Sequence, residues 1–377
     1  MVRQAHHERL KLPVRPELVE GHSVILLGAL SYSLVRISDV EPHALSRTGS
    51  VMDGRLRIAV ACFTALSCAL CVSFAWAQNT SGYPTKPVRM VTASAGSQTD
   101  AMARIISAKL AEKWGQPVVV ENRSGAGGAI GASIVAKAAP DGYTLLFQSP
   151  QFAVGAALNE KLPYDVLKDF AGIARVGNST VVLITSPSFG VKSVKELIVF
   201  AKAQPKPVLF SSAGAGSSTH MNGERFKLTA GIAATHVGFK GAPEAVIEVA
   251  AGRVHYTVTA LSVALPLLRD GKLTPLAMLS TQRSPSLPDV PIITEVFPGY
   301  GRDGAYCLLA PAGTPRPLLA RISADAAQVL SLPDVKERLQ KMEFDVAPTK
   351  LEDFDRLLRN DIETFRKVAR QAGLIAK

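Results

Sequence analysis

The chain has 377 residues, of which 47% are hydrophobic and 19% charged, which excludes wholesale disorder and provides for two domains. Lys and Arg number 42 against 31 Asp and Glu, and the resulting net charge of +11 favours an anionic partner. Aromatic residues make up only 6% and do not alternate with basic runs, so we expect no nucleic-acid partner.

An uncharged apolar run from Ile58 to Ala77 follows two arginines and ends in the small-x-small pattern Ala75-Trp76-Ala77. This pattern is typical of a secretory signal. We expect residues 52–77 to be a signal peptide that is cleaved after Ala77, so that the protein is exported to the periplasm. A membrane anchor is the alternative interpretation, because 20 uncharged residues could span a bilayer.

The 51 residues before Met52 contain HHERLKLPVRPELVEGH, which looks like a translated bacterial intergenic repeat. We expect translation to start at Met52 and residues 1–51 to be an artefactual extension. Cys307 is the one cysteine after the signal peptide, so we expect no intrachain disulfide. It lies in the apolar stretch AYCLLA, which favours a buried structural thiol.

Beyond the signal, short apolar runs alternate with helical patterns. Strands are expected at 88–93, 118–122, 143–149, 181–186, 208–212, 236–239, 254–260, 275–280 and 306–311. Helices are expected at 99–114, 193–204, 217–229, 243–251, 315–330, 334–341 and 351–373, with a Gly-rich loop and helix at 124–139. This alternation predicts an α/β fold with mainly parallel sheets, arranged as two lobes joined by short crossovers.

Two segments of the chain repeat one plan of strand, small-residue turn and helix. Ala95-Gly96-Ser97-Gln98-Thr99-Asp100 in the first parallels Ala215-Gly216-Ser217-Ser218-Thr219-His220 in the second. Small residues let an anion approach the backbone, and a helix start offers N–H groups with partial positive charge. The turns predict two grips on one anionic ligand, although each by itself is also explained as an ordinary helix N-cap.

Other motifs give no support for catalysis, a cofactor or a metal. The run at 125–131 departs from the dinucleotide pattern GxGxxG, because Ile130 occupies the place of the third glycine. No GxSxG, HExxH or CxxC follows the signal peptide. We therefore expect no enzyme, no cofactor, no metal site and no catalytic residue.

From Tyr83 to Lys377 the chain resembles the tripartite tricarboxylate transporter substrate-binding proteins, also called the Bug family of periplasmic receptors. The resemblance is carried by ordered motifs: YPTKPVRMV, GQPVVVENR (115–123), GAGGAIGA (125–132), APDGYTLL (139–146), LPYDVLKDF (162–170), SVKEL (193–197), FKGAPEA (239–245), RSPSLPDVP (283–291) and LLAPAGTP (308–315). It implies a two-lobed Venus-flytrap fold of type II that closes on a small carboxylate. The implied lobes are 83–180 with 304–377, and 181–303.

By position, the resemblance implies ligand contacts from both turns and from neighbouring strand ends. The implied residues are Ser94, Ala95, Gly96, Ser97, Gln98, Thr99, Asp100, Gln148, Ser149, Ser212, Gly214, Gly216, Ser217, Ser218, His220, Phe239, Lys240 and Gly241. The first turn departs from the family's PFPPGGGTD, with Gln98 as an added bulky polar group. Thr259 replaces the family's usual Asp, which makes an amine-bearing ligand less expected.

We expect a monomeric receptor that delivers a small di- or tricarboxylate to membrane transporter subunits. A secreted enzyme that acts on a carboxylated substrate, and a carboxylate sensor for signalling, are the alternatives.

Overall fold

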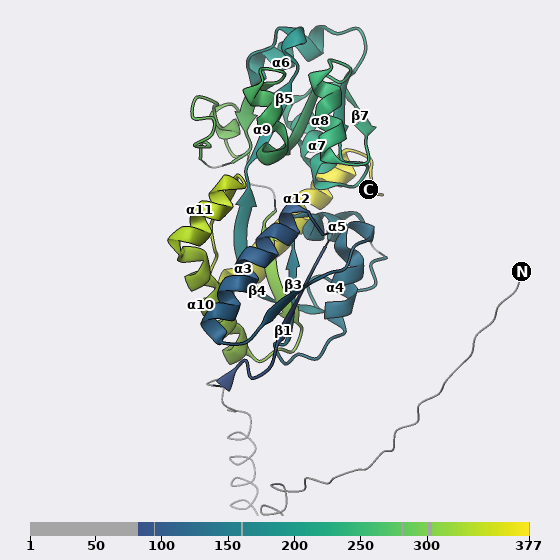
Figure 1. Cartoon of the computed structure of the whole chain (residues 1–377). Coiled ribbons are helices and arrows are strands. Elements are labelled where there is room, and N and C mark those ends of the chain that lie inside the picture. The colour runs from purple at the N-terminus through teal and green to yellow at the C-terminus, as the bar shows by residue number, and fades with distance from the viewer. Residues whose placement is uncertain (1–81, 94, 160, 281, 301–303, 377) are drawn as a thin grey trace, which may run out of the picture. The chain divides into compact units, whose positions relative to one another are not determined.

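A computed structural model describes residues 82–93, 95–159, 161–280, 282–300 and 304–376 (Figure 1). The expectations for residues 1–51, for the signal peptide and for Ser94 lie outside the described residues. Within those residues, no helix combines the length and the apolar character that crossing a membrane requires.

The first of two sheets has six strands in the order β11-β4-β10-β3-β1-β2. Its strands are β1 (Val88–Thr92), β2 (Val118–Asn122), β3 (Thr144–Gln148), β4 (Phe170–Ser179), β10 (Tyr306–Pro311) and β11 (Phe344–Val346). The helices around it are α3 (Gln98–Trp114), α4 (Ala129–Ala136), α5 (Gln151–Leu158), α10 (Arg316–Ser331), α11 (Pro333–Lys341) and α12 (Phe354–Gln371), with short 3₁₀ turns η2 (Ala126–Gly128) and η5 (Leu351–Asp353).

The alternation of side chains along β3 shows that the first sheet is covered on both faces. Leu145 and Phe147 pack with α3, α10 and α11, whereas Leu146 between them packs with α4, α5 and α12. Successive strand residues point to opposite faces, so an unbroken apolar run such as TLLF needs helices on both sides. The two hydrophobic layers fix the strand ends that carry the first turn.

The second sheet has five strands in the order β7-β6-β8-β5-β9. Its strands are β5 (Val181–Thr185), β6 (Val208–Ser212), β7 (Ala234–Gly238), β8 (Tyr256–Ala260) and β9 (Thr274–Met278). Around it lie α6 (Val194–Ala203), α7 (Ser218–Ala230), α8 (Ala242–Ala250) and α9 (Leu261–Arg269), with 3₁₀ turns η3 (Pro187–Phe189) and η4 (Ile293–Glu295). Helices α6 and α7 cover one face, and α8 and α9 cover the other.

Both sheets are mixed, and the expectation of mainly parallel sheets is wrong in this respect. In the first sheet β1 pairs in parallel with β2 and β3, but β10 runs antiparallel to β3 and β4. In the second, β6 pairs in parallel with β7 and β8, but β5 runs antiparallel to β8 and β9. The antiparallel strands follow the two crossovers: β4 leads through Thr180 into β5, and the chain returns to the first sheet as β10.

Most predicted elements are confirmed within a few residues, and four were missed. The missed elements are helix α5, strand β4, helix α9, which contains Pro266, and the three-residue strand β11. Strand β4 contains two glycines and an arginine, and it is buried because strands β10 and β11 flank it and helices α10 and α12 pack against it. The buried position of Cys307 in β10 is confirmed, and burial raises the pKa of its thiol to about 12.

Candidate functional site

The first turn joins the carboxyl end of β1 to α3. Ser97 is the N-cap of α3, and its hydroxyl oxygen accepts the N–H of Asp100 at 3.2 Å. The Asp100 carboxylate in turn accepts the N–H of Gly96 at 2.9 Å. Gly96 has φ +73°, a left-handed conformation that glycine adopts without steric cost. A side chain and a backbone bend thus fix this turn from both ends.

Asp100 is buried, and its carboxylate is fully engaged within the protein. Asn122, at the end of the neighbouring strand β2, donates to its Oδ1 at 2.9 Å, and Arg104 lies 3.1 Å from the same oxygen. Burial by itself would raise the pKa of Asp100, but the hydrogen bonds from Asn122, Gly96 and Arg104 lower it below its ordinary value. Asp100 therefore braces the turn as a carboxylate.

Gln98 ties the first turn to distant parts of the same sheet. Its Nε2 donates to the carbonyl of Met342 at 2.9 Å, and its Oε1 accepts from Ser179 at 2.8 Å and from Tyr306 at 3.0 Å. The bulky Gln98 carboxamide, which distinguishes this turn, thus makes hydrogen bonds within the protein. It anchors the start of α3 to the end of β4, where the chain crosses to the second sheet.

The second turn joins the carboxyl end of β6 to α7 and repeats the first almost angle for angle. Ser217 is the N-cap with φ −77° and ψ 160°, against −76° and 162° for Ser97. Gly216 has φ +73°, as Gly96 does. Its N–H is accepted by His220 Nδ1 at 3.1 Å, in the place of the Asp100 carboxylate. The repeat predicted from sequence is confirmed as a repeat of backbone geometry.

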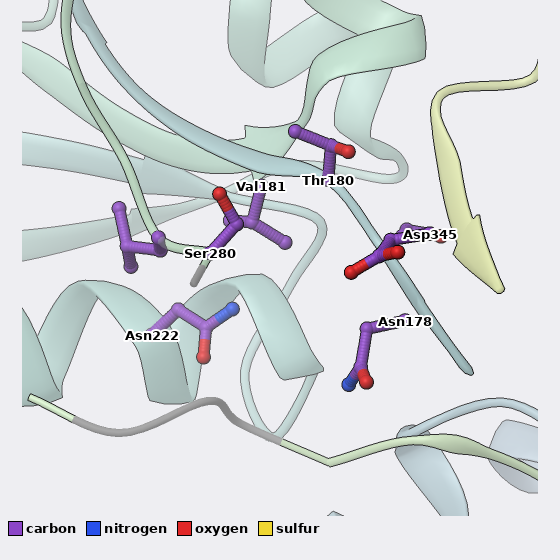
Figure 2. A pocket seen from close by; sticks show the side chains of 8 residues that line it. Asn178, Thr180, Val181, Asn222, Ser280 and Asp345 are labelled. Atoms are coloured by element: carbon purple, nitrogen blue, oxygen red, sulfur yellow. The ribbon is translucent and has the colours of Figure 1, made fainter. Parts of the chain in front are cut away.

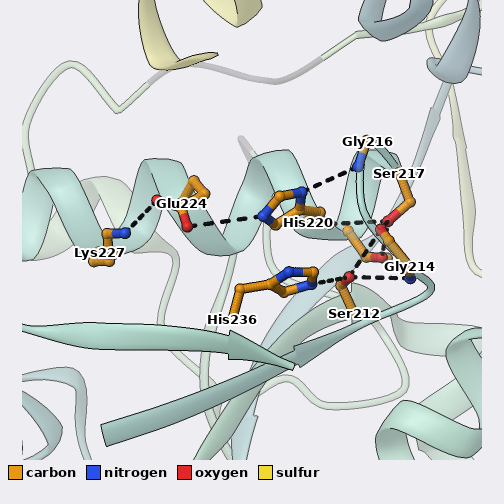
Figure 3. Close-up of polar contacts among 9 residues, drawn as sticks. Ser212, Gly214, Gly216, Ser217, His220, Glu224, Lys227 and His236 are labelled. Carbon is orange, nitrogen blue, oxygen red and sulfur yellow. Dashed lines mark hydrogen bonds and ion pairs between the residues drawn. The ribbon is translucent and has the colours of Figure 1, made fainter. Parts of the chain in front are cut away.

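His220 is buried inside a chain of polar contacts (Figure 3). Because His220 Nδ1 accepts from Gly216, its proton is on Nε2, which faces Glu224 Oε1 at 3.8 Å. Lys227 Nζ lies 2.5 Å from the other carboxylate oxygen of Glu224. A neutral imidazole between a turn amide and an ion pair holds the turn in place, and it is buried away from a substrate.

His236, on β7, stacks on His220 with ring centroids 3.7 Å apart. Its Nε2 lies 2.6 Å from the hydroxyl of Ser212, which also accepts the N–H of Gly214 at 3.1 Å. Burial, and secondly the neighbouring His220, lower the pKa of His236 to about 4. Ser212 is fully buried, so this Ser–His contact braces the second turn and does not present a nucleophile.

The remaining predicted residues divide between the two sheets. Gln148 is buried at the end of β3, where its amide donates to the Gly128 carbonyl at 3.3 Å, and Ser149 follows it half-buried. Beside the second turn, an open groove of about 650 Å³ has as its described lining Gly214, Ala215, His236, Gly238, Phe239, Lys240 and Glu244. Gly241 is the N-cap of α8, one residue beyond that lining.

Gln151, which the sequence analysis did not single out, connects the two sheets directly. From the first turn of α5, its Nε2 donates to the Gly216 carbonyl at 2.9 Å and its Oε1 accepts the Ser218 N–H at 3.0 Å. Met221 of α7 packs beside this contact into the hydrophobic layer of the first sheet. A glutamine after a proline carries no signal for such a role, because only the fold brings it to the second turn.

The chemistry of these turns suits an oxyanion. Both occupy carboxyl ends of parallel strands, the edge at which α/β proteins bind ligands, and both combine N–H groups with Ser or Thr hydroxyls at a helix start. Among the described residues, no group of three or more His, Cys, Asp or Glu side chains is placed to hold a metal ion.

A family model described as "Tripartite tricarboxylate transporter family receptor" matches residues 102–374. The chain belongs to this family. Protein BugT of Bordetella pertussis is 36% identical over 259 residues, which cover 68% of this chain and 79% of BugT. The family is one of solute-binding receptors, so this chain is a periplasmic solute receptor and no enzyme.

Solved structures of receptors give the same fold. "R. palustris Rpa4515 with adipate" is 32% identical with a TM-score of 0.67, over 77% of this chain and 98% of that one. "MatC (Rpa3494) from Rhodopseudomonas palustris with bound malate" is 30% identical with a TM-score of 0.64, over 76% and 99%. The expected two-lobed α/β receptor fold is therefore confirmed, with mixed sheets.

Proposed function

We propose that this receptor binds a small organic di- or tricarboxylate between the two turns and delivers it to a tripartite membrane transporter. The observation that carries the proposal is the pair of matched turns, one on each sheet, with equal φ at Gly96 and Gly216 and equivalent serine N-caps. Two relatives whose structures hold adipate and malate support the ligand class.

The proposed ligand site contains the residues named from sequence, but their roles differ. Backbone N–H groups and half-buried hydroxyls of the turns would contact the carboxylate, since the side chains around them are small. Asp100, Gln98 and His220 would act as positioning residues, because their polar atoms are already paired within the protein. Lys240, exposed beside the second turn, would add positive charge at the edge.

We propose residues 83–180 with 304–377 as one lobe and 181–303 as the other, with the ligand stabilising the closed arrangement. A ligand shifts such an equilibrium by its differential affinity for the two arrangements. At a concentration 100 times its Kd it raises the free energy of unfolding by about 2.7 kcal/mol. A carboxylate that touches both turns meets this requirement.

The decisive experiment is a thermal-shift screen of mono-, di- and tricarboxylates against residues 78–377, followed by calorimetric titration of each acid that raises Tm. We expect at least one di- or tricarboxylate to stabilise the protein, with loss of the shift in Gly96→Val and Gly216→Val variants. A folded protein that no panel acid stabilises would refute the proposal. Turnover of a bound acid would instead favour an enzyme, and binding without an uptake defect in a deletion strain would favour a sensor.

We also propose that the chain is exported and cleaved after Ala77. The uncharged run 58–77 and its small-x-small end support this proposal. Mass spectrometry of the exported protein should find Gln78 at its N-terminus. Peptides from residues 3–51 in the cell extract would refute translation from Met52.

A further inference from the structure

A small cavity lies where the chain crosses from the first sheet to the second (Figure 2). Its volume is about 20 Å³, enough for a single group the size of a water molecule. The described residues that line it come from β4, β5, α7, β11 and the segment after β9: Asn178, Ser179, Thr180, Val181, Asn222, Leu279, Ser280 and Asp345. The cavity is thus built from both sheets.

The cavity adjoins both turns of the proposed ligand site. Ser179, on its wall, donates to Gln98 of the first turn at 2.8 Å. Asn222 lies on α7 four residues after Ser218, and residues four apart share one face of a helix. A small molecule held at the two turns therefore lies near this cavity.

Asn222 is the residue that indicates what the cavity binds. The residue is 7% exposed, and its Oδ1 is buried without a hydrogen-bond partner among the described residues. Figure 2 shows its carboxamide beside the cavity, across from Asn178 and Asp345. A buried carbonyl without a donor destabilises the folded protein, so a donor that enters the cavity removes this penalty.

Among the other polar side chains of the wall, two serines have donated their hydroxyl hydrogens and Asn178 has donated one of its two amide hydrogens. Asn178 Nδ2 donates to the Gly304 carbonyl, and Ser280 Oγ donates to the Gln282 carbonyl at 2.5 Å. The hydroxyl of Ser179 is committed to Gln98. These groups offer lone pairs, Asp345 adds a carboxylate, and none of the described lining residues carries a positive charge. The described side chains of the wall therefore offer mainly acceptors, and together with the Asp345 carboxylate they disfavour an anion.

We infer that this hinge cavity is a subsite for one hydrogen-bond donor of the ligand, a hydroxyl or an ammonium group, with Asn222 as its specificity-determining acceptor. The inference rests on the proposed function, because the turns must hold the carboxylate. A second carboxylate does not fit, since it is larger than one water and its charge meets lone pairs and Asp345. The receptor thus prefers hydroxy- or amino-substituted carboxylates over their unsubstituted counterparts. The amino preference departs from the expectation drawn from Thr259, because Asp345 supplies a carboxylate in this cavity.

The test measures Kd by calorimetric titration for matched acids: butanoate, 4-hydroxybutanoate and 4-aminobutanoate, then glutarate, 2-hydroxyglutarate and glutamate. We expect a substituted acid to bind about 10-fold more tightly than its unsubstituted counterpart in at least one set. Asn222→Ala should abolish this preference, and Asn222→Asp, which keeps an acceptor, should retain it and favour the ammonium. Asn360→Ala, an exposed asparagine on α12, is the matched control and should leave the preference unchanged.

Circular dichroism melts confirm that each variant folds before its titration is interpreted. Equal affinities within both sets, or a preference that survives in Asn222→Ala, would overturn the inference and leave a structural water as the cavity's occupant. In either case the proposed function stands, because carboxylates still bind. If no acid binds, neither in these two sets nor in the broader carboxylate screen, both proposals fail together.

Discussion

The two turns have the same backbone conformation and differ in the side chain that holds it in place. Asp100 holds Gly96 through a carboxylate that Asn122 and Arg104 also contact. His220 holds Gly216 through a neutral imidazole that stacks on His236. A charged and an uncharged acceptor thus produce the same φ and ψ angles, which shows that the turn geometry depends on an acceptor at this position and not on its charge.

The largest expected effect follows from removing the charged brace. Asp100→Ala leaves the Gly96 N–H and the Asn122 amide without their carboxylate acceptor in a buried site, so the free energy of unfolding should fall by about 3 kcal/mol. Urea unfolding of residues 78–377 measures this change. Asp355→Ala on the exposed side of α12 serves as control, and a loss below 1 kcal/mol for Asp100→Ala would contradict the assigned role.

Lowering the pH should destabilise the second turn before the first, because His236 beside the second turn and Asp100 in the first turn titrate in different pH ranges. The pKa of His236 is about 4 in the folded protein and 6.5 when unfolded, so its contribution is complete above pH 6.5 and is lost as pH falls towards 4. The cost should reach about 2 kcal/mol. Asp100, with a folded pKa below 3.8, keeps its contribution throughout this range.

Tm measured from pH 8 to pH 4.5 tests this difference between the turns. The Tm of His236→Gln should depend less steeply on pH than that of the wild type. His255 also has a lowered pKa from burial, so the difference between the two proteins, and not the wild-type curve alone, isolates His236. Parallel curves would show that the stacked pair does not govern the second turn in acid.

Two glutamines connect the turns to other parts of the protein, and removing either one should have a smaller effect on stability. Gln98 ties the first turn within its own sheet, whereas Gln151 ties the second turn to the other sheet. Gln98→Ala and Gln151→Ala should each lower the free energy of unfolding by about 1–2 kcal/mol. Gln151→Glu should be as harmful as Gln151→Ala, because a carboxylate cannot donate to the Gly216 carbonyl; a wild-type stability for this variant would exclude the two-point contact.

The smallest expected effect on the free energy of unfolding follows from replacing the glycines of the two turns. Gly96→Ala and Gly216→Ala should each cost about 1 kcal/mol, because both residues have φ +73°. A new Cβ meets open space at Gly96 and only an ordinary contact with Leu158 at Gly216, so the two costs should agree. Chemical denaturation of the paired variants measures them, and a clear inequality would mean that the turns are not equivalent in energy.

Local sequence determined the turns and the N-caps, because their hydrogen bonds connect residues three or four positions apart, and the apolar runs beside them predicted the strands. The family and the receptor fold were also predictable, since motifs along the whole chain carry the resemblance. Antiparallel β5 and β10, the bridge from Gln151 and the cavity beside Asn222 were decided by tertiary structure. Each depends on groups that are 65 or more positions apart or belong to different sheets, and no local pattern encodes where such groups meet.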